Sequence, residues 1–110
     1  MKLLEQSGHA ENEHALQLTN LGYCLADVGR TAEGRKVLQE SVAEISRLHM
    51  RKRWLSEPLA ALANLEFAAG NKKKAVELVK RAIAALDGEQ GSDVIALRQY
   101  EAEQLTAWTK

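Results

Sequence analysis

The side chains best suited to metal binding or nucleophilic chemistry are three histidines and one cysteine: His9, His14, His49 and Cys24. A metal site needs several such ligands together, but His9 and His14 are five residues apart, which puts them on different sides of a helix. Cys24 would need a histidine and an orienting group beside it to act as a nucleophile. Its place next to the packing stripe of a predicted helix indicates a small buried residue instead. We therefore expect no metal, no cofactor and no nucleophilic catalysis.

The acidic side chains also lack an arrangement for acid–base catalysis. Glu11 and Glu13, like Glu101 and Glu103, are two residues apart within predicted helices. Residues two apart on a helix do not face one another. The sequence has no glycine-rich loop of the kind that binds phosphate. These observations predict that the protein is not an enzyme.

Basic residues gather between positions 47 and 53, beside Trp54, and again between positions 72 and 81. Such patches can bind nucleic acid or an acidic partner. However, 15 Lys and Arg are balanced by 15 Asp and Glu in the 110 residues, which favours solvated helix faces and no nucleic-acid partner. No apolar run approaches the roughly 18 residues that span a bilayer, so no membrane partner is expected. A single cysteine, Cys24, fits a reducing compartment, and we expect a cytoplasmic location.

The elements that would position these side chains are helices in one compact domain, residues 1–110. The chain has one proline and 5% aromatic residues, a composition that favours helix over sheet. Glycine breaks at 29–31 and 70–72, each followed by a capping Thr31 or Asn71, indicate the tight turns of two antiparallel helical hairpins. Apolar stripes flank both breaks. They comprise Leu18, Leu21, Gly22, Leu25 and Val28; Val37, Leu38, Ser41, Val42, Ile45 and Leu48; Leu59, Leu62, Leu65 and Ala69; and Ala75, Leu78, Val79, Ala82, Ile83 and Leu86.

The remaining boundaries follow from similar signals. Ser56 and Pro58 mark the start of the third helix. A last helix begins after a cap at Ser92 and Asp93, and it carries Val94, Leu97, Leu105 and Trp108 on one side. We predict five helices, plus a partial turn at residues 2–7.

The two hairpins repeat one pattern of small residues. Gly22, Gly29 and Gly34 of the first hairpin correspond to Ala63, Gly70 and Ala75 of the second, and 63 minus 22 gives a period of 41. Small residues at matched places allow two helices to approach closely. The repetition predicts stacked hairpins rather than an arbitrary helical bundle.

This pattern resembles the tetratricopeptide repeat, whose signature places Leu-Gly in the first helix and small residues in the second. The matching residues are Leu18, Leu21, Gly22, Leu25, Gly34 and Leu38 in the first unit, and Leu59, Leu62, Ala63, Glu66, Ala75, Val79 and Ala82 in the second. The signature's Trp and Tyr are replaced by leucine or lost, and its closing proline has no counterpart at Ser46 or Asp87. The resemblance implies an all-α fold of stacked antiparallel helical hairpins, a fragment of an α-solenoid.

The family's unit has 34 residues, so a period of 41 is seven residues longer, about two helical turns. This length predicts one long second helix from about residue 32 to about residue 53, as in the kinesin-light-chain type of repeat. We expect hairpins at 12–54 and 56–87, and a capping or half-repeat helix at 92–109. Residues 2–6 look like the tail of a preceding unit's second helix.

The resemblance implies a scaffold that binds a protein or peptide on the concave surface lined by the first helix of each hairpin. Tyr23 and Phe67 would anchor apolar side chains, while Asn20 and Asn64 would bond the partner's backbone. In the alternative, these aromatics pack between hairpins and the asparagines are only solvated. The expected partner-binding residues are Leu16, Thr19, Asn20, Tyr23 and Asp27 on the first hairpin, and Glu57, Ala60, Ala61, Asn64, Phe67 and Ala68 on the second.

Two other functions stay open at this point. Two and a half hairpins are few for a repeat array, which usually needs about three units. The first alternative is therefore a structural module that joins copies of itself into a homo-oligomer. The second is a sensor region of a larger signalling protein, which follows from the resemblance alone.

Overall fold

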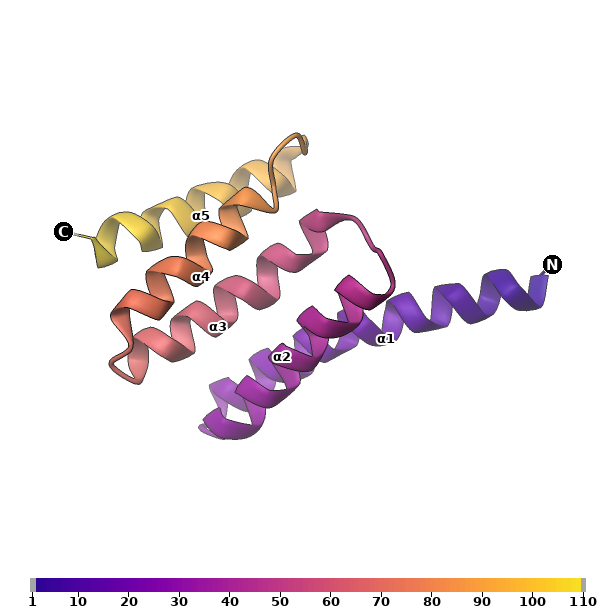
Figure 1. The fold of residues 1–110 in the computed structure, drawn as a ribbon, viewed down its shortest axis with the longest axis horizontal. Helices are drawn as coiled ribbons and strands as arrows, with labels where there is room; N and C mark the ends of the chain where they lie inside the picture. Colours follow the sequence, from indigo (N-terminus) through magenta and orange to yellow (C-terminus); the bar gives the residue numbers. More distant parts are fainter. Residues whose placement is uncertain (1, 110) are drawn as a thin grey trace. The chain divides into compact units, whose positions relative to one another are not determined.

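The computed structural model describes the backbone of residues 2–109 and the side chains of residues 12–109. These residues form five α-helices, one 3₁₀ helix and no strand, so the predicted all-α fold is confirmed (Figure 1). The elements are α1 (Lys2–Asp27), α2 (Thr31–Arg47), η1 (Lys52–Leu55), α3 (Ser56–Ala68), α4 (Lys72–Ala84) and α5 (Ser92–Trp108). The chain divides into two compact units: unit 1, Met1–Arg51, and unit 2, Lys52–Lys110.

Unit 1 is an antiparallel hairpin of α1 and α2 that closes through two glycines (Figure 1). A Cβ atom at Gly34 would lie 3.0 Å from the carbonyl oxygen of Gly22 and 3.1 Å from the amide nitrogen of Ala26. A Cβ atom at Gly22 would lie 2.6 Å from Cδ2 of Leu38. A larger residue at Gly34 would press against the backbone of α1, and one at Gly22 would force Leu38 to move. The close approach predicted from the small residues is therefore confirmed in this hairpin.

The side of α1 that faces α2 differs in part from the predicted stripe. Ala15 and Thr19 are buried together with Gly22. Leu21 is 48% exposed and Val28 is 72% exposed, although both were expected to pack. Small side chains occupy the line of closest approach, because only they let the two backbones come so near. The leucine-rich stripe consequently lies at the edge of the helix contact.

Both hairpins turn in the same way. Gly29 and Gly70 adopt left-handed φ angles of 87° and 90°. In each turn the amide of the residue after the glycine donates a hydrogen bond of 2.8 Å to the carbonyl oxygen four residues before the glycine. This bond closes a helix C-terminus in a geometry that favours glycine, since glycine has no Cβ to clash. The two predicted turns are confirmed at the predicted residues.

The side-chain caps predicted at the starts of α2, α4 and α5 are not formed. Thr31 and Ser92 are the first residues of α2 and α5 rather than the residues that precede them. Asn71 does precede α4, but its side-chain amide donates to Glu66 Oε2 at 3.1 Å instead of capping the helix. A carboxylate five residues earlier in the chain thus competes successfully for the asparagine side chain.

The long second helix predicted from residue 32 to residue 53 is not formed. α2 ends at Arg47, and His49 adopts a left-handed φ of 54°. The amide of Met50 donates to the carbonyl of Ile45, which closes the helix end as a glycine turn would. No glycine or proline marks the end of α2, so a prediction from helical periodicity alone placed this end too late in the chain. The extra residues of the 41-residue period lie instead in the connection 48–51 and in η1.

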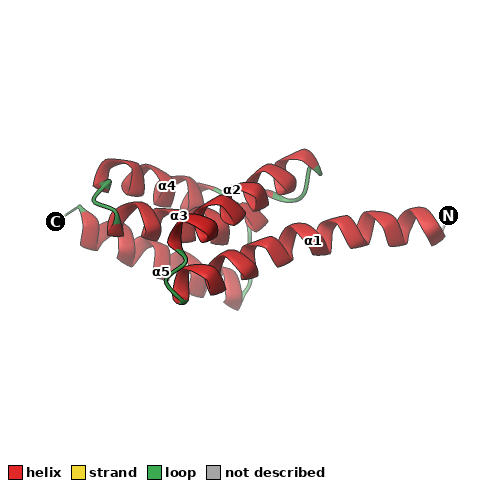
Figure 2. Ribbon diagram, turned by 90° about the horizontal axis from the view of Figure 1, so that it is seen from below, coloured by secondary structure: helices red, strands yellow, loops and turns green. Residues whose placement is uncertain are grey.

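The separate turn predicted at residues 2–7 is also absent. α1 runs unbroken from Lys2 to Asp27, and its first half extends past the end of α2 (Figure 2). The surrounding leucine, glutamate, glutamine and alanine are good helix formers, and one glycine inside a helix costs only about 1 kcal/mol. Residues 2–6 therefore belong to α1 and do not form a separate helix before it.

Unit 2 is a second antiparallel hairpin, α3 and α4, followed by α5 (Figure 1). Ala63 and Ala75, the counterparts of Gly22 and Gly34, are both fully buried. α3 begins at Ser56, as predicted, with Pro58 in its first turn. The core of unit 2 also contains Leu59, Leu62, Leu65, Leu78, Val79, Ala82, Leu86 and Val94.

Candidate functional site

Four of the five partner-binding residues predicted on the first hairpin share one face of α1. Leu16, Asn20, Tyr23 and Asp27 follow one another at spacings of four, three and four, which aligns them along a helix. Asn20 and Asp27 are exposed, whereas Leu16 and Tyr23 are half-buried. This face therefore combines polar tips that water can reach with apolar side chains that a partner could cover.

Thr19 does not belong to that face, because it is 4% exposed and lies against α2. Its hydroxyl oxygen is 2.6 Å from the hydroxyl oxygen of Ser41. Ser41 in turn donates to the carbonyl oxygen of Ala15 at 3.0 Å, so the proton between the two hydroxyls comes from Thr19. The chain of bonds ties α1 to α2. Thr19 thus holds the hairpin together.

The residues predicted on α3 divide in a similar way. Glu57 and Ala68 are exposed, and Asn64 and Phe67 are half-buried. Ala60 and Ala61 are buried. Of the six residues predicted on α3, four are therefore at least partly accessible to a partner, and the two alanines are not.

Helix α5 covers the Asn64–Phe67 pair. The side-chain amide of Gln104 donates to Asn64 Oδ1 at 2.5 Å, and Asn64 Nδ2 lies 3.5 Å from the hydroxyl of Tyr100. The ring of Trp108 meets the ring of Phe67 edge to face, with centroids 4.8 Å apart and planes at 89°. Phe67 therefore packs against a helix of its own unit, α5, and Asn64 is hydrogen-bonded to that helix rather than only solvated.

A buried carboxyl lies further along the same contact. Ser56 donates a hydrogen bond of 2.6 Å to Glu101 Oε2, and both residues are fully buried. Burial raises the pKa of Glu101 to about 7; the Ser56 hydrogen bond opposes this rise and the nearby charge of Glu57 adds to it. The second oxygen, Oε1, has no hydrogen-bond partner among the described residues. A carboxyl placed in this way favours its protonated form.

Sequence reasoning missed this contact set on α5. Glu101, Gln104 and Trp108 are spaced by three and four, so they share one face of a helix. Glu101 also falls on the apolar stripe that begins at Val94 and Leu97. A charged residue within an apolar stripe was the available signal that this side of α5 makes a polar contact with another helix.

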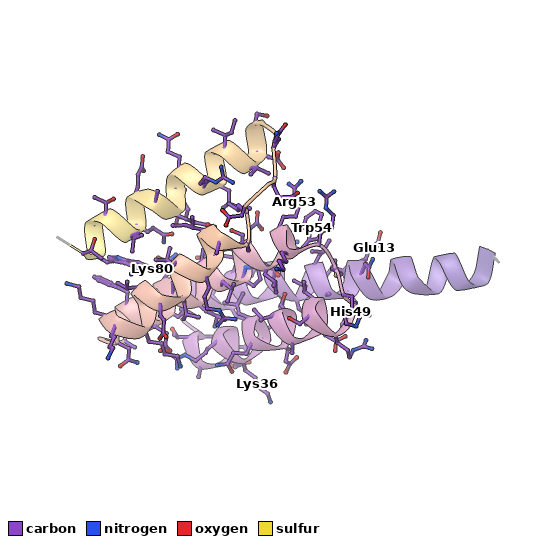
Figure 3. All side chains as sticks on the ribbon, turned by 45° about the horizontal axis from the view of Figure 1, so that its top comes forward. Glu13, Lys36, His49, Arg53, Trp54 and Lys80 are labelled. Carbon is purple, nitrogen blue, oxygen red and sulfur yellow. The ribbon has the colours of Figure 1, made fainter. Side chains whose placement is uncertain are left out.

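In the first predicted basic cluster, Arg47 is paired with Glu44, and Arg53 is paired with acidic residues of unit 2. Arg53 of η1 donates to Asp93 Oδ2 at 2.7 Å and lies 3.7 Å from Glu89 Oε1. Its guanidinium also lies 5.2 Å from the centre of the Trp54 ring (Figure 3). The hydrogen bond from Arg53 lowers the pKa of Asp93. Arg53 is therefore engaged within unit 2.

Other kinds of site find little support in the described part of the chain. Cys24 is exposed, which corrects the expected buried position. Within residues 12–109, no three His, Cys, Asp or Glu side chains gather in a way that could hold a metal ion. Among the described helices, none is both long and apolar enough to cross a bilayer.

Comparison with known proteins agrees with the resemblance found in the sequence. The family model described as Tetratricopeptide repeat matches residues 13–87, well over half of the 110 residues. The chain belongs to the tetratricopeptide-repeat family. The matched span of this tetratricopeptide-repeat protein contains the second half of α1 and all of α2, α3 and α4, and it ends before α5. No curated protein and no solved structure matches the chain. Tetratricopeptide repeats generally serve as protein–protein interaction modules, a non-enzymatic role.

Proposed function

We propose that this tetratricopeptide-repeat protein is a scaffold that binds a peptide or helix of a partner protein through the first helix of each hairpin, without catalysis. The binding residues on α1 are Leu16, Asn20, Tyr23 and Asp27, and those on α3 are Glu57, Asn64 and Phe67. The lone cysteine, Cys24, supports a reducing location, the cytoplasm.

The observation that carries the proposal is the pairing of an amide with an aromatic ring on each first helix. Asn20 precedes Tyr23 by three residues, and Asn64 precedes Phe67 by three, so each pair lies on one side of its helix. An amide can donate to and accept from a peptide backbone, while the ring beside it supplies apolar contact at low conformational cost. Asn64 and Phe67 already make this kind of contact with a helix, α5.

The proposal can be tested on the face of α1. Peptides would be selected from a displayed library on the full chain, and their affinities measured again with Asn20→Ala combined with Tyr23→Ala. We expect a loss of about tenfold or more, because tyrosine is a typical binding hot spot and the partner's backbone would also lose its hydrogen bonds to Asn20. The matched control is Lys36→Ala combined with Glu40→Ala, which changes two exposed residues of α2. Unchanged affinity in a variant that melts like the native chain would remove the α1 face from the proposal.

Self-association is a second candidate, and one specific observation favours it. Leu21 and Val28 are exposed apolar side chains seven residues apart on α1, a spacing that places them on the same side of the helix. A second copy of the chain that covered this side of α1 would remove both apolar side chains from water. Light scattering at two concentrations separates the candidates, because a mass that rises toward a dimer supports assembly and a constant monomer mass opposes it.

A further inference from the structure

Helix α5 packs chiefly on α4, and it runs parallel to α3, whose side chains it meets at three successive places. Glu101 meets Ser56, Gln104 meets Asn64, and Trp108 meets Phe67, so residue numbers rise together along both helices. Figure 1 shows the two helices running in the same direction within unit 2. Two of these three α3 residues, Asn64 and Phe67, are the ones proposed above to bind a partner. The partner-binding face of α3 is thus already occupied by a helix of the same chain.

The contact is incompletely satisfied on the α5 side. Glu101 Oε1 and Gln104 Oε1 are both buried without a hydrogen-bond partner among the described residues. A buried polar oxygen without a partner weakens the contact that buries it, because the oxygen gave up its bonds to water. Such atoms are rare in native proteins, and two of them on one short contact indicate a helix that is held less firmly than the hairpin beneath it.

The charges around Glu101 do not compensate for its burial. Glu57 of α3 is the charged residue that acts on this carboxyl, and it disfavours ionisation. The buried residues of α4 are the apolar Ala75, Leu78, Val79 and Ala82. Nearby cations are bonded elsewhere: Arg98 of α5 donates to the carbonyl oxygen of Leu86, and Arg53 of η1 donates to Asp93. An ionised Glu101 would therefore loosen α5 from α3.

We propose that α5 is a releasable cover of the α3 face, and that this face accepts an amphipathic helix of a partner that takes the place of α5. The inference rests on the proposed function and adds the kind of partner. The incoming helix runs parallel to α3 and carries a hydrogen-bonding polar residue, an amide and an aromatic residue at positions i, i+3 and i+7, the spacing of Glu101, Gln104 and Trp108. An uncharged amide at the first position fits better than a carboxylate, because it meets Ser56 without a buried charge.

The experiment uses the full chain and a fluorescent peptide of the α5 sequence, residues 92–109, as the probe. Trp108→Ala in the full chain removes the ring contact with Phe67 and so loosens the cover, while the probe keeps its own tryptophan. Fluorescence anisotropy at pH 8 should show probe binding about tenfold tighter than to the native chain, because a larger fraction of the α3 face is open. Glu101→Gln should act in the opposite direction and weaken probe binding. Ile95→Ala, an exposed position of α5, is the matched control and should leave binding unchanged.

Hydrogen exchange of the same variants separates failure of the cover from failure of the binding face. The proposal expects the amides of α5 to exchange faster than those of α3 and α4, and faster still in Trp108→Ala. If α5 stays protected in Trp108→Ala, or if that variant binds the probe no better than the native chain does, the cover idea is overturned and partner binding by α3 still stands. If α5 opens but no variant binds the probe, the α3 face does not accept a helix and both proposals fail for unit 2. Addition of Phe67→Ala to Trp108→Ala should abolish the gain.

Discussion

The buried carboxyl of Glu101 predicts a specific pH dependence of stability for unit 2. In the unfolded chain the carboxyl has its ordinary pKa of 4.5, whereas in the folded chain the pKa is raised to about 7. Between these two values the folded chain keeps a proton that the unfolded chain has lost. Stability therefore falls as the pH rises through this window, and it changes little from this group below pH 4.5 or above pH 7.

The size of the effect follows from the same two values. A rise from 4.5 to about 7 corresponds to about 3 kcal/mol, at about 1.36 kcal/mol per pKa unit. Glu101→Gln keeps the shape of the side chain and its bond to Ser56 but cannot ionise. We expect the variant and the native chain to be about equally stable at pH 4, and the variant to be more stable by about 3 kcal/mol at pH 8.

The assay is urea unfolding followed by tryptophan fluorescence, from pH 4 to pH 8.5. Both tryptophans, Trp54 and Trp108, lie in unit 2, so the signal reports that unit. Glu103→Gln, which changes an exposed carboxyl on the same helix, is the control for the effect of replacing a glutamate by glutamine on α5. A stability difference between Glu101→Gln and the native chain that stays constant with pH would refute the argument. So would a native chain that gains stability relative to the variant as the pH rises.

Two further predictions concern unit 1. Gly34→Ala should destabilise the α1–α2 hairpin by about 1–3 kcal/mol, because its Cβ would lie 3.0 Å from the carbonyl oxygen of Gly22, and thermal melting followed by circular dichroism would show it. Lys36→Ala on the same helix is the control, and an unchanged melting temperature for Gly34→Ala would contradict the close approach. His49→Gly should stabilise the chain by about 1 kcal/mol in urea unfolding, since glycine relieves the left-handed φ of 54°. A loss of stability in His49→Gly would show that the histidine side chain contributes more than the backbone strain costs.

Much of the fold could be predicted from local patterns along the chain. The turns at Gly29 and Gly70 were located correctly because a left-handed helix end strongly favours glycine, and that preference is visible in the residue itself. The end of α2 was missed because His49 adopts the same conformation without such a preference. A histidine in the left-handed region depends on its surroundings, and these cannot be read from neighbouring residues.

The candidate site could be predicted only as a set of helix faces. The spacing of Asn20, Tyr23 and Asp27 places them together on α1 whatever the tertiary structure is. Thr19 was assigned to the wrong side, because two small neighbours, Ala15 and Gly22, moved the line of contact with α2 away from the leucine stripe. Helical periodicity locates an apolar stripe to within about one residue, and a difference of one residue rotates a side chain by about 100° around the helix.

The sequence by itself determined that the chain forms helical hairpins, where they turn and which small residues bring their helices together. These features depend on backbone preferences and on side-chain size, which belong to single residues and their near neighbours. Only the tertiary structure decided that α5 lies on the Asn64–Phe67 pair and buries Glu101 against Ser56. That choice joins residues 40 to 45 positions apart, from Asn64–Gln104 to Ser56–Glu101, and it depends on which surfaces remain open once α3 and α4 have packed.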